Sequence, residues 1–208
     1  MRSAWRNFRG TVTRPARTFA DLETDPHAAR DGAVVLLAVC VVYTLILLIF
    51  LGRGYPAAAR SVLGLPPEDQ YVAQVWYQGP LFFSTTAITA AVLVLLSRVG
   101  GRPTGYGIAF ARISLATAVP FAVTTMMVEA AVGLLLAAGV LAPADLLAWL
   151  TGPGSWFALL YQVVGVAWLT VLVIVATRAT LSRGWLVAIP AGMVLLVVYA
   201  LPVALLIR

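Results

Sequence analysis

The 208-residue chain is poor in the residues that carry most enzymatic and metal chemistry. It has one histidine, His27, and one cysteine, Cys40, so it offers neither a cysteine–histidine metal cluster nor an intramolecular disulfide. His27 precedes the first long apolar run, which excludes a serine–histidine pair inside the membrane. Paired catalytic carboxylates are excluded there too, because Glu129 is alone among the apolar runs. We therefore expect no enzymatic activity, no metal and no cofactor.

Lysine is absent, and charge of either sign is scarce. Charged residues make up 11% of the chain and hydrophobic residues 62%, whereas soluble domains contain about 25% charged residues. A soluble core does not need this composition, so the chain is expected to be an integral membrane protein. The net charge of +6 does not indicate nucleic-acid binding, because the arginines lie in short segments between apolar runs. Anionic lipid headgroups are the expected partners of such segments.

The apolar runs predict five membrane-spanning helices, since about 20 apolar residues cross a bilayer. The expected fold is an all-α polytopic integral membrane protein, a five-helix transmembrane bundle with short interfacial helices. Residues 1–32 are expected to form a cytoplasmic interfacial segment and 33–208 the transmembrane domain. Short helices are expected in the loop after the first span, one over 56–64 and one beginning near Pro66. The expected spans are 33–51, 79–97, 113–138, 156–177 and 185–207.

The arginines are unevenly distributed between the two sides of this topology. The N-terminal segment and the loops after the second and fourth spans hold eleven of them. The other side holds three, Arg53, Arg60 and Arg208. By the positive-inside rule the N-terminus is expected in the cytoplasm and the C-terminus outside the cell membrane. Tryptophans are expected in the interfacial belts at the span ends, namely Trp76, Trp149, Trp156 and Trp185.

The N-terminal segment has the pattern of a helix that lies on a membrane. Trp5, Phe8 and Val12 fall at i, i+3 and i+7, and arginines occupy the other faces. Anionic headgroups are the expected lipid partners, and a protein partner on the cytoplasmic face is a further expectation. The expected lipid-facing basic residues are Arg2, Arg6, Arg9, Arg14 and Arg17.

The third span breaks two rules of membrane helices. Pro120 interrupts a run that should be continuous helix, and Glu129 places a carboxyl group in the apolar layer. Because neighbouring spans run in opposite directions, polar residues of the other spans are expected at a similar depth in the outer half of the bilayer. The expected polar layer comprises Glu129, Tyr161, Gln162, Thr44, Ser84, Thr85 and Thr86.

Two interpretations of this layer compete. In the favoured one, hydroxyl and amide groups join the helices by hydrogen bonds worth about 0.6–2 kcal/mol each, and Gln162 holds a neutral Glu129. In the other, Glu129 is a proton or cation site in a water-filled vestibule of a small transporter or channel. The first is favoured because transporters usually show more than one intramembrane charge and a repeated helix interruption.

Short motifs give a resemblance to a known family. The stretch WYQGPLFFSTT resembles the signature that opens the second span of the Yip (Ypt/Rab-interacting) domain family, with Trp76 in place of its acid and Gln78 inserted. Gly105-Tyr106, followed by a helix containing Pro120, is similar to the family's second signature. The resemblance implies five spans, a cytoplasmic N-terminus and a role in organising membranes or partner proteins, as in trafficking. The first motif matches at Tyr77, Gly79, Pro80, Leu81, Thr85 and Thr86.

Overall fold

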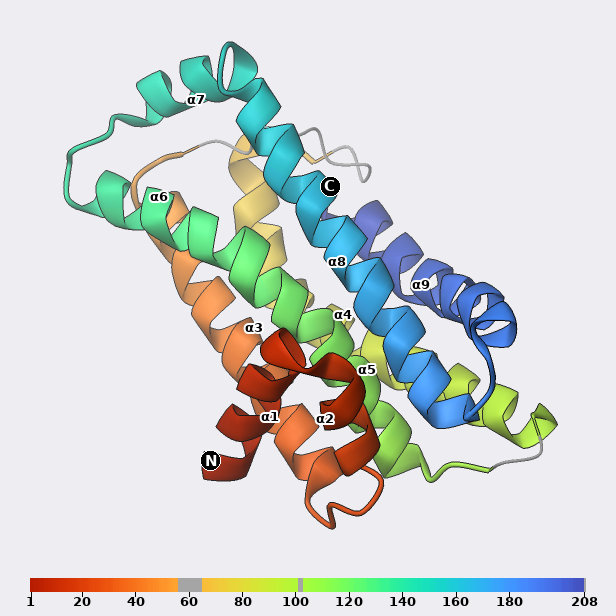
Figure 1. Cartoon of the computed structure of the whole chain (residues 1–208). Helices are drawn as coiled ribbons and strands as arrows, with labels where there is room; N and C mark the ends of the chain where they lie inside the picture. Colours follow the sequence, from red (N-terminus) through yellow and green to blue (C-terminus); the bar gives the residue numbers. More distant parts are fainter. Residues whose placement is uncertain (56–64, 101–102, 208) are drawn as a thin grey trace.

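The structure, a computed structural model, describes residues 1–55, 65–100 and 103–207, and these residues form helices joined by short connections. Long helices lie side by side in a bundle, and two short N-terminal helices cover one end of it (Figure 1). The all-α bundle expected from the sequence is therefore confirmed. The short helix expected over 56–64 lies outside the described residues, as do Arg60, Arg102 and Arg208.

Five helical segments among the described residues are long and apolar enough to cross a membrane, as expected. The third contains a π-helix and is therefore divided into three elements. The chain is thus a multi-span helical membrane protein. The bounds of the spans are α3 Ala28–Gly52, α4 Pro67–Val99, α5 Tyr106–Phe121 with η1 Ala122–Met126 and α6 Met127–Ala137, α8 Ser155–Leu181, and α9 Trp185–Ile207.

Several of the expected boundaries fall inside helices. The third span, expected from residue 113, begins with α5 at Tyr106. α3 begins at Ala28, so the division between residues 32 and 33 lies within its first turns. α4 begins at Pro67 instead of Gly79, because the stretch expected as a separate loop helix continues into the span without a break. Pro67 occupies the first turn of α4, where the missing N–H of proline costs no helical hydrogen bond.

The proline in the third span is followed by a change of helix type. Pro120 has no N–H to donate, and its ring crowds the carbonyl four residues earlier. α5 ends at Phe121, and the chain then forms the π-helix η1 before it returns to α-helix. The Thr124 hydroxyl donates to the Pro120 carbonyl over 2.7 Å, so this oxygen remains satisfied within the distorted turn. The interruption predicted at Pro120 is present, and its form is a π-helix.

The two ends of the bundle are built differently. One end, here called the base, contains α1 (Arg2–Thr13) and α2 (Pro15–Asp21), the N-terminal ends of α3, α5 and α9, and the C-terminal ends of α4 and α8 (Figure 1). The far end contains α6 and α7 (Pro143–Thr151) with the opposite ends of the long helices. Every residue of 111–120 in α5 is buried, whereas no residue of 155–171 in α8 is. The base is closely packed, and the far end is open.

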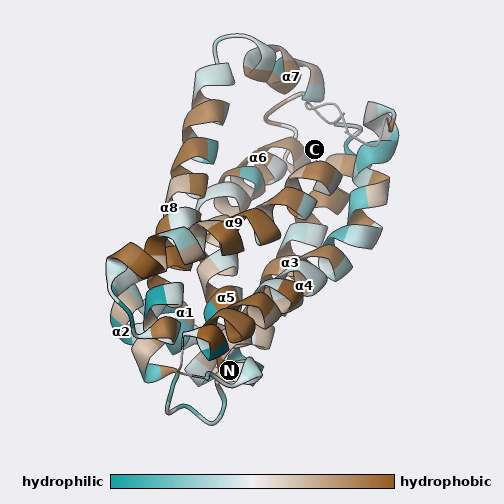
Figure 2. Ribbon diagram, turned by 90° about the vertical axis from the view of Figure 1, so that its right-hand side faces the viewer, coloured by the Kyte–Doolittle hydropathy of each residue, from teal (hydrophilic) through white to brown (hydrophobic). Residues whose placement is uncertain are grey.

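Apolar side chains face outward along the spans, as a lipid environment requires. Figure 2 shows hydrophobic residues along α8 and α9, which carry exposed leucines and valines. The exposed tryptophans fall toward both ends, in agreement with interfacial belts. Trp76, Trp149 and Trp156 lie toward the far end, and Trp5 and Trp185 lie at the base.

Candidate functional site

A buried arginine joins the N-terminal segment to the base. Arg112 lies two turns into α5 and is 1% exposed. Its Nε donates to the Phe19 carbonyl over 2.9 Å, its Nη1 to Thr180 Oγ1 over 3.2 Å, and its Nη2 to Glu23 Oε2 over 2.6 Å. One guanidinium therefore contacts α2, the turn after it and the C-terminal end of α8. The third span was expected to begin at residue 113, so Arg112 lay just outside it, and its distant partners were not predicted.

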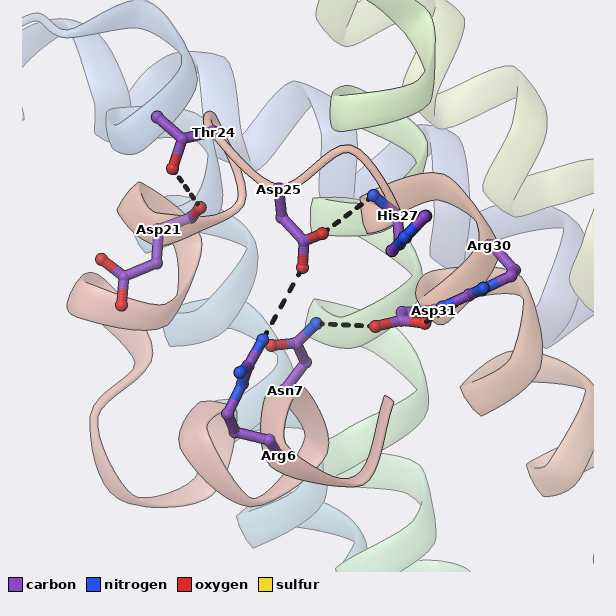
Figure 3. Close-up of polar contacts among 8 residues, drawn as sticks. All are labelled: Arg6, Asn7, Asp21, Thr24, Asp25, His27, Arg30 and Asp31. Atoms are coloured by element: carbon purple, nitrogen blue, oxygen red, sulfur yellow. Dashed lines mark hydrogen bonds and ion pairs between the residues drawn. The ribbon is translucent and has the colours of Figure 1, made fainter. Parts of the chain in front are cut away.

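A second polar contact holds α1 against α3. Asp31 in α3 is 1% exposed and accepts from Asn7 Nδ2 over 3.3 Å (Figure 3). Arg30 lies 3.3 Å from the other oxygen of this carboxylate, so the buried charge has a partner of opposite sign. Together with Arg112, this contact makes residues 1–27 part of the fold.

The face that α1 turns to the bundle is not the aromatic one. Its buried residues are Ala4, Asn7 and Thr11, which also follow the i, i+3, i+7 spacing. Trp5 is 65% exposed and Val12 is 38% exposed, and Phe8, partly buried, stacks on Trp5 with ring centroids 5.5 Å apart. α1 therefore has two distinct faces. The face with small and polar residues packs on the bundle, and the face with Trp5 is exposed.

The arginines expected to face lipid are on the surface. Two of them form ion pairs within the segment, Arg6 with Asp25 and Arg17 with Asp21, each at 3.9 Å. Both arginine side chains are exposed, whereas the Asp25 side chain is 17% exposed. Ion pairs as long as 3.9 Å contribute little to stability, so the two guanidinium groups stay available for other anions. The exposed residues are Arg2, Arg6, Arg9, Arg14 and Arg17.

At the far end, Glu129 lies among tyrosines. The hydroxyl of the buried Tyr43 donates to the Glu129 carboxyl group. Tyr43 is therefore a hydrogen-bond partner of Glu129, a role that was expected for Gln162. Tyr55 and Tyr71 lie within electrostatic reach of the same carboxyl group, and of Tyr161. We call Tyr43, Tyr55, Tyr71 and Tyr161 the tyrosine cluster. Burial, together with Tyr161 and Glu129, raises the pKa of Tyr55 in the loop to about 12, so its hydroxyl stays protonated at neutral pH.

Three glutamines form a buried polar row on α4, here called the glutamine row. Gln70, Gln74 and Gln78 follow the i, i+4, i+8 spacing of one helix face and are 3%, 4% and 0% exposed. Gln78 Nε2 donates to Thr44 Oγ1 over 3.3 Å and to the Cys40 carbonyl over 3.5 Å, which joins α4 to α3. This row was not predicted, because the second span was expected to begin at residue 79 and the row lies before it. The spacing alone would have found it.

The serine and threonines expected in the polar layer do not share one face of α4. Thr85 and Thr86 are buried, and the Thr85 hydroxyl donates to the Leu81 carbonyl over 2.8 Å. Ser84 is exposed on the lipid side and also donates to Leu81, over 3.1 Å. Successive residues of an α-helix are turned by about 100°, so three neighbours cannot all point inward.

Gln162 faces a cavity in the apolar layer between η1, α8 and α9. The cavity has a volume of about 140 Å³. Gly165 allows α8 to approach η1 here, because a Cβ at this position would lie 2.7 Å from Thr124 Oγ1. Tyr161 and Gln162, adjacent in sequence, therefore have different surroundings. The polar residues that line the cavity with Gln162 are Thr117, Thr124, Thr125 and Tyr199, and Pro120 also borders it.

The family-motif residues occupy separate parts of the bundle. Tyr77 and Gly79 are half-buried in α4, and Pro80 is exposed beside them. Gly105 precedes the first residue of α5, and the hydroxyl of Tyr106 donates to the Ala87 carbonyl in α4 over 3.3 Å.

The described residues contain no group of three or more histidine, cysteine, aspartate or glutamate side chains that could hold a metal ion. The arrangement provides hydrogen-bonding groups in the membrane and a basic surface at the base. Comparison of the chain with known protein families, curated proteins and solved structures finds no match.

Proposed function

We propose that the chain is a non-enzymatic membrane protein that organises anionic lipid and a partner protein at its base. The observation that supports this is the contact of Arg112 with Phe19 and Glu23. A flexible tail would present its arginines in many arrangements. A segment packed on the bundle presents them in one arrangement, so less conformational entropy is lost when a partner binds.

The positive-inside rule supports a cytoplasmic location for the base. Arg98, Arg178 and Arg183 belong to the same end of the bundle as the N-terminal arginines. Arg183 donates to the Gly100 carbonyl over 2.8 Å, so the two loops of this end also contact each other. We propose an N-terminus in the cytoplasm and a C-terminus outside the plasma membrane. The Yip-like motifs favour the same orientation and a similar scaffold role.

Co-purification tests the function. The wild-type protein is extracted from native membranes and its bound lipids and proteins are compared with those of Arg112→Gln, which removes the contact with α2 but keeps every exposed arginine. We expect the variant to lose the partner and its anionic lipid. Arg98→Gln, an exposed change at the same end, is the control and should retain both. Equal retention by Arg112→Gln would contradict the proposal.

Orientation is tested separately by cysteine labelling. Cys40 is buried and is the one cysteine, so Cys40→Ser gives a clean background. In intact cells, an impermeant maleimide should label Arg208→Cys and leave Ser3→Cys unlabelled. Labelling of position 3 from outside would overturn the proposed orientation.

Transport is a second candidate function, favoured by the buried glutamine row beside the tyrosine cluster and Glu129. Together these groups place many hydrogen-bonding side chains in the far half of the bundle, where a polar solute or proton would need them. Purified protein in liposomes should then show proton or cation flux that Glu129→Gln abolishes and Gln78→Leu reduces. The exposed Ser84→Ala is the matched control. Absence of flux in the wild type would exclude this candidate.

A further inference from the structure

A hollow at the base lies between α1 and α2. It has a volume of about 560 Å³. Arg6 and Asn7 come from α1, Arg14 from the joint between the helices, and Arg17 and Thr18 from α2. Figure 3 shows Arg6 directed toward Asp25 and Asn7 directed toward Asp31. We infer that this hollow binds the phosphate of an anionic phospholipid.

The walls of the hollow are held in place. Gly10 permits the close approach of the two helices, because a Cβ there would lie 2.4 Å from Thr18 Oγ1. α1 is fixed to α3 through the contact of Asn7 with Asp31, and α2 is fixed to α5 through the contact of Phe19 with Arg112. Three arginines therefore line one space without further ordering of the backbone, which favours binding.

The charges suit a singly charged phosphodiester. Three arginines line the hollow against two aspartates, Asp21 and Asp25. Arg6 and Arg17 form the loose ion pairs described above, and Arg14 takes part in neither. Guanidinium groups bind phosphate oxygens through paired, charge-assisted hydrogen bonds, which are stronger than ion pairs as long as 3.9 Å. The hydrogen bonds between the arginines and an entering phosphate are therefore expected to be stronger than the two arginine–aspartate ion pairs that they replace.

The position of the hollow selects a lipid as the source of the phosphate. Trp5 is exposed on α1, and Trp185 is exposed at the start of α9, at the same end of the bundle. Exposed tryptophans mark the headgroup level of a membrane protein. The hollow lies beside this level, where phosphodiesters are concentrated and their acyl chains can run along the spans.

The inference rests on the proposed lipid-organising function, and one experiment separates the two. Native mass spectrometry of the full chain in detergent measures binding of phosphatidylglycerol, with phosphatidylcholine as the zwitterionic comparison. Arg6→Gln/Arg14→Gln removes two guanidinium groups from the hollow. Arg2→Gln/Arg9→Gln removes two exposed charges from α1 outside it and is the matched control. Unchanged thermal unfolding confirms that both doubles are folded.

We expect the hollow double to weaken phosphatidylglycerol binding about tenfold and the control double to change it less than about twofold. Equal loss in both doubles would overturn the site but not the proposed function, for which a diffuse basic surface is sufficient. No preference for phosphatidylglycerol in the wild type would overturn both. Displacement of the lipid by millimolar inorganic phosphate would identify a soluble phosphate as the ligand and overturn the assignment to a lipid.

Discussion

The base and the far end of the same bundle are stabilised by different interactions. At the base, small residues such as Ala109, Ala111 and Ala116 are fully buried, and the helices approach closely. Gly32 shows the closest approach to the backbone of a neighbouring helix, because a Cβ there would lie 2.7 Å from the Ala111 Cα. Close packing of small residues is a main source of helix association in membranes, where apolar burial gives little driving force.

The far end has larger and more polar contacts. Tyr55 and Tyr71 lie with ring centroids 6.3 Å apart, and Phe50 lies 5.4 Å from Tyr55. A Cβ added at Gly133 of α6 would lie 3.5 Å from the Phe50 ring, which is an ordinary van der Waals distance. Side-chain hydrogen bonds and aromatic contacts hold helices that stand further apart. The comparison indicates a rigid base and a more adaptable far end, and substitutions at matched positions test it.

The largest effect is expected at Arg112. Arg112→Met leaves the Phe19 carbonyl without its donor and removes the ion pair with Glu23, which we expect to lower the free energy of unfolding by roughly 2–4 kcal/mol. Thermal unfolding of the purified protein measures the loss, and limited proteolysis should show early cleavage within residues 1–27. Arg98→Met, exposed at the same end, should leave both unchanged. Protection of 1–27 in Arg112→Met would contradict the role given to this arginine.

Alanine substitution at one glycine of each end should show directly whether the two ends differ in how closely they are packed. Gly32→Ala forces a Cβ against the backbone of α5, so we expect a loss of about 1–3 kcal/mol. Gly133→Ala meets only ordinary contacts, and alanine favours helix, so its stability should stay within about 0.5 kcal/mol of wild type or rise. Thermal unfolding of both variants measures the difference. Equal losses would show that the far end is packed as closely as the base.

A smaller effect is expected at the hydrogen bond of Glu129. Tyr43→Phe removes the hydroxyl that donates to this carboxyl group and keeps the ring, so we expect a loss of about 1 kcal/mol. In the double variant Tyr43→Phe/Glu129→Leu, the two losses should be less than additive in a double-mutant cycle. Strict additivity would show that the two side chains do not interact.

The smallest effect is expected at Ser84. Its hydroxyl bonds to the Leu81 carbonyl of its own helix on the lipid side, so Ser84→Ala should change stability by less than about 0.5 kcal/mol. Thr85→Val, one residue on and buried, should cost more, because its hydroxyl contacts the Leu81 and Phe82 carbonyls inside the bundle. Thermal unfolding of both tests whether neighbouring positions differ as the helix rotation requires.

The spans and the break at Pro120 were predictable, because long apolar runs and a proline act locally along the chain. The position of Glu129 within the third span was predictable for the same reason. Its partner was not, because the rotation of each helix about its axis decides whether Tyr43 or Gln162 faces it, and packing sets that rotation. The buried contacts of Arg112 were not predictable, because its partners come from segments that no local pattern connects. The packing role of Asn7 was not predicted, because the aromatic pattern of α1 indicated a different face of this helix.

The contacts of Arg112 also constrain the order in which the protein is completed during synthesis. Glu23 leaves the ribosome before the five spans described above, Arg112 follows 89 residues later, and Thr180 another 68 residues after that. α1 and α2 are therefore made before these spans, yet their docking site is complete only when the end of α8 has been inserted. During this interval α1 and α2 either lie on the membrane surface or are held only by the contact of α1 with α3. The full set of Arg112 contacts at the base can therefore form only after the fourth span has been inserted.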